Sequence, residues 1–126
     1  MDLEQLAKNH LQTNKVKAHH IHLIQMMHQA VKEGFHLLRI QHTIFAYIPQ
    51  GNNVYFSIVD GGSPREFMRA SRHFVEAMHH AGFKTMTIYT DKPDYAKHVL
   101  LKSGAKYVDY KRHDRPVDPF LMRADI

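Results

Sequence analysis

The chain contains no cysteine, which excludes disulfide bridges and every metal site built on thiolate ligands. It also has no apolar stretch long enough to cross a bilayer. Residues 1–5 lack the basic segment and the apolar run of a signal peptide. We therefore expect a cytoplasmic protein without membrane contact.

Long basic runs and recognisable nucleic-acid-reading motifs are missing as well, although the net charge is +5 with histidine counted as neutral. Nucleic-acid binding is thus a weak alternative. What is present is ordinary globular composition, with 44% hydrophobic and 23% charged residues. A length of 126 residues is enough for one domain with a real core.

Apolar residues at helical spacing predict two N-terminal helices, over residues 3–12 and 15–33, with Gly34 as a stop. The pattern then changes to β-branched and aromatic residues. We expect a strand near 37–40, and a hairpin whose strands, 43–48 and 54–59, flank a turn at 49–53.

The best local signal is Ser63-Pro64-Arg65-Glu66, which combines a helix N-cap, proline at the first helical position and a capping box. That helix is expected to end before Gly82. A strand over 84–90, a helix over 93–103, a strand over 105–111 and a short last strand at 120–122 complete the prediction.

The predicted fold class is α/β (α+β), a mixed and mostly antiparallel sheet flanked by helices, with two N-terminal helices. We expect a single domain over 1–126: a helical pair (1–34), a core of sheet and helices (35–112), and a C-terminal tail or last strand (113–126).

One segment resembles a known family. Ile88-Tyr89-Thr90-Asp91, then Ala96, then Leu100-Leu101-Lys102-Ser103-Gly104-Ala105 is similar to a strand–helix–glycine segment of the GNAT acetyltransferases. The similarity covers roughly residues 35–112. It implies the GNAT fold and, for an active member, acetyl-CoA as cofactor.

The family's cofactor loop, which binds pyrophosphate through backbone N–H groups at a helix N-terminus, departs from its pattern here. The equivalent stretch is Asp60-Gly61-Gly62-Ser63-Pro64-Arg65-Glu66. Pro64 has no N–H, and the capping box is expected to use others. If CoA binds at all, Gly61, Gly62, Ser63, Arg65 and Arg69 are the candidate contacts.

The resemblance also implies a tyrosine general acid, and counting back from Gly104 this position is Leu100. Tyr95, about one turn earlier, and Tyr55 are the remaining catalytic candidates if the protein is an enzyme. Titratable groups suited to proton transfer are few, with Tyr47 and Asp60 the other nearest ones.

A GNAT-like pattern without its cofactor loop resembles the small internal virion proteins of short-tailed phages. This implies a structural or assembly role through protein partners or self-association, in the host cytoplasm or the virion, without a cofactor. The N-terminal helices and the tail at 120–122 are the candidate contact surfaces. The alternative is an acyl-CoA-dependent N-acetyltransferase with a divergent cofactor loop.

Twelve histidines raise the question of a metal. His19, His20 and His22 point in different directions around a helix, and His-x₃-His spacing is absent, so we expect no metal site. Arg65, Arg69 and Arg72 form a row on one helix side. This row is either a solvated face, a phosphate-binding ridge or a contact for an acidic partner.

Overall fold

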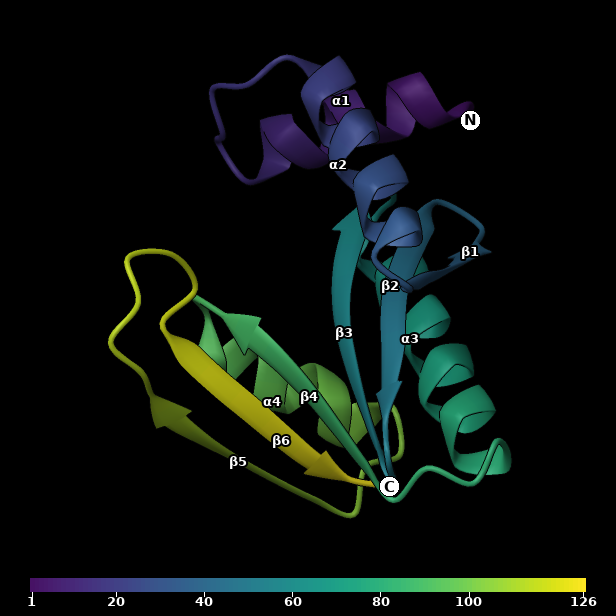
Figure 1. The fold of residues 1–126 in the computed structure, drawn as a ribbon, viewed down its shortest axis with the longest axis vertical. Helices are drawn as coiled ribbons and strands as arrows, with labels where there is room; N and C mark the ends of the chain where they lie inside the picture. The colour runs from purple at the N-terminus through teal and green to yellow at the C-terminus, as the bar shows by residue number, and fades with distance from the viewer.

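A computed structural model describes residues 1–126. In chain order (Figure 1) the elements are α1 (Leu3–Thr13), α2 (His20–Lys32), β1 (His36–Ile40), β2 (Thr43–Gln50), β3 (Asn53–Asp60), α3 (Pro64–His80), β4 (Thr85–Thr90), α4 (Pro93–Lys102), β5 (Tyr107–Arg112) and β6 (Phe120–Asp125).

The strands form one sheet in the order β1-β2-β3-β4-β6-β5. Every neighbouring pair is antiparallel except β3 and β4, which are parallel and connected through α3. The predicted fold class is confirmed: the sheet is mixed and mostly antiparallel, helices pack on its faces, and two helices precede it in the chain.

The start of the second helix was predicted wrongly, at residue 15 instead of His20. Lys15 has a left-handed backbone (φ 55°), which is incompatible with a helix interior. The N-cap is His19, whose Nδ1 accepts from the backbone N–H of Ile21. The histidine ring serves as the N-cap acceptor, a role that Ser or Asp usually has, and N-cap preferences do not predict histidine at this position.

The hairpin turn is shorter than predicted, because Gln50 pairs directly with Asn53 and only two residues lie between them. Pro49 therefore belongs to β2, opposite Val54. β1 begins at His36, opposite Tyr47, so β1 does not reach Pro49 and does not need the N–H that this residue lacks.

Two cores lie on opposite faces of the sheet. The larger, built around Phe45, Phe56 and Phe74, fills the space between the sheet and α3 and α4; Phe45 and Phe74 stack with ring centroids 4.2 Å apart. The smaller joins Leu6 and Met27 of the N-terminal helices to β2. In Figure 1 these helices cover only one end of the sheet.

The C-terminal residues are a paired strand rather than a loose tail. β6 runs from Phe120 to Asp125 and lies between β4 and β5, with partners on both sides. The predicted strand at 120–122 was therefore in the right place but too short. Since both of its edges are paired, the segment is not free to dock on another protein.

Candidate functional site

The central feature of the molecule is the divergence of its two parallel strands. β3 and β4 pair only from Asn53 to Tyr55, opposite Thr85 to Thr87. The side chain of Asn53 reinforces this end: its Oδ1 accepts from the Thr85 hydroxyl at 2.8 Å, and its amide donates to the Thr87 hydroxyl at 3.0 Å. Beyond it the strands separate, and Figure 1 shows the sheet opening into two halves.

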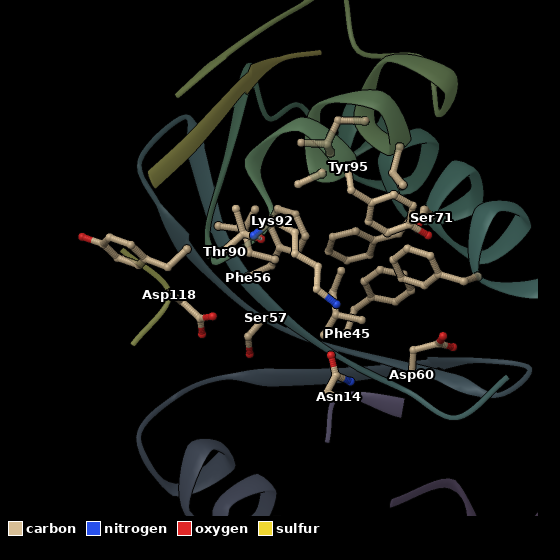
Figure 2. A pocket seen from close by; sticks show the side chains of 18 of the residues that line it. Asn14, Phe45, Phe56, Ser57, Asp60, Ser71, Thr90, Lys92, Tyr95 and Asp118 are labelled. Atoms are coloured by element: carbon tan, nitrogen blue, oxygen red, sulfur yellow. Dashed lines mark hydrogen bonds between the residues drawn. The ribbon is translucent and has the colours of Figure 1, made fainter. Parts of the chain in front are cut away.

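A cleft of about 480 Å³ lies where the strands separate. Aromatic side chains of β2, β3 and α3 form much of its apolar wall, and α4 contributes Tyr95 and the buried Leu100. Figure 2 shows Asn14, Ser57 and Asp60 on the side nearest the N-terminal helices, and Asp118 at another edge. The cleft thus combines an apolar interior with polar groups around it.

One polar atom in the cleft wall has no partner. Ser71 of α3 is only 4% exposed, and its hydroxyl makes no hydrogen bond. A buried hydroxyl without a partner costs about 1–3 kcal/mol. The sequence placed Ser71 in the apolar stripe of its helix but gave no sign that its hydroxyl would face a cavity.

The loop before α3 uses nearly all of its backbone N–H groups internally. The amides of Asp60 and Gly61 donate to His10 Nδ1 (3.1 Å) and to the His42 carbonyl oxygen (2.9 Å). The amide of Gly62 donates to the side chain of Asp60 (3.2 Å).

The capping box, confirmed in both directions, accounts for the next amides: Ser63 N–H donates to Glu66 Oε1 and Glu66 N–H to Ser63 Oγ. Pro64 has none to give. In the segment from residue 60 to 66, only the N–H of Arg65 has no acceptor.

Helix α1 covers the same loop. The side-chain amide of Asn9 donates to the Gly61 carbonyl oxygen at 3.1 Å. Leu6 is wholly buried, and its backbone lies so close to Gly61 that a Cβ there would be 2.6 Å from the Leu6 carbonyl oxygen. Gly61 is thus required for close approach of the helix.

The electrostatics of the loop are set by two acid–histidine pairs. Burial raises the pKa of Asp60, although hydrogen bonds from Thr43 and the Gly62 amide oppose this. Burial lowers the pKa of His10, whose Nδ1 must be unprotonated to accept from the Asp60 amide. The site therefore favours a neutral His10 with its proton on Nε2.

At the start of α3, hydrogen bonds from the Ser63 backbone and then from His42 lower the pKa of Glu66. His42 donates from Nδ1 to Glu66 Oε2. A carboxylate therefore occupies the helix N-terminus, the place where a bound anion would otherwise meet the helix dipole.

The two tyrosines proposed as catalytic candidates are not brought together. Tyr95 is half exposed on α4 and lines the cleft. Tyr55 does not line it: its ring packs near those of Phe35 and Tyr89, at 6.0 and 6.2 Å, on the sheet face opposite α3 and α4. Burial raises the pKa of Tyr55, which makes it a weaker proton donor.

Among the candidate cofactor contacts, Gly62 lines the cleft, while Gly61 lies beneath α1. Arg65 and Arg69 are exposed on the outer side of α3 and do not line the cleft. Of the five candidate contacts, only Gly62 lines the cleft.

No three histidine or acidic side chains converge in an arrangement that could hold a metal ion. The ring centroids of His19 and His20 lie 4.2 Å apart with the rings tilted by 30°, and His22 lies edge-on to His19 at 6.4 Å.

Sequence reasoning missed the contribution of α1 to the site. His10, Thr13 and Asn14 line the cleft, although they come from a helix that the sequence placed outside the core of the domain. The only indication in the sequence is that His10 lies four residues after Leu6, and therefore on the same, inward side of the helix. Nothing local to α1 identifies the loop 50 residues later as its partner.

None of the four helices combines the length and apolar character needed to cross a membrane. Comparison with protein-family models and with curated proteins finds no match for this chain.

Proposed function

We propose that this chain is a non-catalytic protein of GNAT-like fold that acts as a structural or assembly component through contacts with other proteins, in a setting such as a phage particle. The observation that carries the proposal is the internal use of the N–H groups between Asp60 and Glu66. A pyrophosphate at this loop would have to displace these hydrogen bonds and approach the Glu66 carboxylate.

The cleft wall supports the same proposal. Leu100, at the position where the resemblance implies a tyrosine, is buried and carries no proton to transfer. Tyr95 is the one tyrosine of α4, and it is half exposed, with no hydrogen bond to position its hydroxyl. General acid catalysis needs a titratable group held within reach of the leaving atom.

The N-terminal helices supply the surface for partners. Ile21, Met26 and Val31 of α2 are 49%, 69% and 49% exposed, so apolar side chains remain on the outside of a helix that buries Met27 inward. Their five-residue spacing places them about 140° apart around the helix axis, so they offer single apolar contacts on different sides of α2 and not one contiguous patch.

The alternative, an acyl-CoA-dependent N-acetyltransferase, is favoured by one observation, the cleft between the parallel strands. Its volume of about 480 Å³ is in the range of ligand pockets. The alternative then requires α1 to move away from Gly61 before the cofactor enters.

Isothermal titration with acetyl-CoA and with CoA tests the proposal. We expect no heat and no thermal shift at ligand concentrations of about 1 mM. Micromolar binding that Arg65→Ala or Arg69→Ala weakens would overturn it in favour of the enzyme. Lys32→Ala, exposed at the end of α2, is a matched control away from the loop, because it also removes one positive charge.

A further inference from the structure

The outer face of α3 has an unusual charge arrangement. Arg65, Arg69 and Arg72 are all exposed, and none of them forms an ion pair. His73 and the exposed pair His79 and His80 continue the row toward the C-terminus of the helix.

Acidic residues do not balance these charges. The helix has two: Glu66, whose carboxylate is bound by His42 and by the Ser63 amide, and the exposed Glu76. Glu76 lies one turn after Arg72, yet it makes no ion pair with it. The face therefore presents net positive charge.

A groove continues this face onto neighbouring elements. It has a volume of about 280 Å³, and Arg72 and His79 line it together with Lys106, which follows α4. Glu76 lines it too. Positive charge thus extends from the N-terminus of α3 to the loop before β5.

We propose that this face binds the phosphodiester backbone of nucleic acid without reading its sequence. The three arginines span about 10 Å of helix axis, a length over which a duplex displays about six phosphate charges. Arginine binds phosphate oxygens with a planar fork of donors.

The composition of the face distinguishes a phosphate backbone from an acidic protein. Stable protein interfaces are organised around buried apolar or aromatic anchors. The exposed large hydrophobic residues of this chain lie on other elements, and none is on α3. A backbone of phosphates needs no such anchor, because counterion release supplies the binding free energy.

This inference is independent of the assembly role proposed above, since it uses a different face from α2. Figure 1 shows α3 and the N-terminal helices at separate places on the sheet.

The test is fluorescence anisotropy with a labelled duplex of about 20 base pairs, measured between about 50 and 200 mM salt. The variant carries Arg65→Gln, Arg69→Gln and Arg72→Gln, since glutamine is also a good helix former. We expect its affinity to fall tenfold or more, and the slope of log K against log salt to become shallower by about 2 to 3. Circular dichroism of the variant establishes that the fold is kept.

A matched control removes the same charge elsewhere, by Lys15→Gln, Lys17→Gln and Lys32→Gln, all exposed, outside α3 and free of ion pairs. We expect the control to lose less than about threefold in affinity. Equal losses in the two variants, or no binding of the duplex by the wild type, would overturn the proposal. Binding of a polyglutamate peptide in preference to the duplex would also overturn it, in favour of an acidic protein partner.

Discussion

Replacing Gly61 by alanine tests the contact between α1 and the loop. An added Cβ would lie 2.6 Å from the Leu6 carbonyl oxygen and 2.8 Å from the Leu6 Cα. These are backbone atoms, so no side-chain rotation relieves the clash. Ordinary contact begins near 3.4 Å, and α1 must therefore withdraw by about 0.8 Å.

That movement strains the hydrogen bonds from Asn9 to the Gly61 carbonyl and from the Asp60 amide to His10. Overpacking a close contact costs about 1–3 kcal/mol, and we expect a loss of about 2 kcal/mol in the free energy of unfolding, measured by urea denaturation. Hydrogen exchange of the Asp60 amide should accelerate with it.

The neighbouring glycine is the control. A Cβ at Gly62 would lie 3.1 Å from the His42 Cβ, a much smaller overlap that a displacement of about 0.3 Å relieves, so we expect Gly62→Ala to cost less than about 1 kcal/mol. If Gly61→Ala is as stable as the wild type and its Asp60 amide stays protected, then α1 does not hold the loop as described.

Three further predictions concern the core and the titrating site. Phe74→Ala should lower the free energy of unfolding by about 3–5 kcal/mol, because it empties the stack with Phe45; a loss below about 1 kcal/mol in urea denaturation would contradict this. Ser71→Ala removes a buried hydroxyl without a partner and should raise the melting temperature, with a gain of about 0.5–1 kcal/mol; a clear loss would show that the hydroxyl is satisfied. Burial lowers the pKa of His10 below the ordinary histidine pKa of about 6.5, so the unfolded chain binds a proton at this residue more readily than the folded one. The stability that neutral His10 contributes is present above about pH 6.5 and is lost as the pH falls toward the lowered pKa. The difference in unfolding free energy between wild type and His10→Gln should therefore shrink between about pH 7.5 and 5.5, and a constant difference would refute the assignment.

The elements of the core could be predicted because their signals are local. The capping box at Ser63 requires only four consecutive residues, and α3 begins where they place it. The alternation of β2 and β3 likewise fixes their faces from neighbouring residues.

What could not be predicted depends on distant partners. The order β4-β6-β5 places the last strand inside the sheet, and only tertiary packing decides this. Tertiary packing also decides that the pairing of β3 and β4 stops at Tyr55 and Thr87. The cleft exists because the pairing stops there. The sequence thus identified the loop from Gly61 to Glu66 as part of a candidate site, but it did not indicate that helix α1 covers this loop.

The most direct test of the account follows the amides of residues 60–66 one by one. Two-dimensional ¹H–¹⁵N spectra recorded during titration with acetyl-CoA report each N–H separately. The account predicts that the resonances of Gly61, Gly62, Ser63 and Glu66 stay in place up to about 1 mM ligand, because their hydrogen bonds are internal. Saturable shifts at these amides would show that the loop opens to an anion, and would contradict a non-catalytic role.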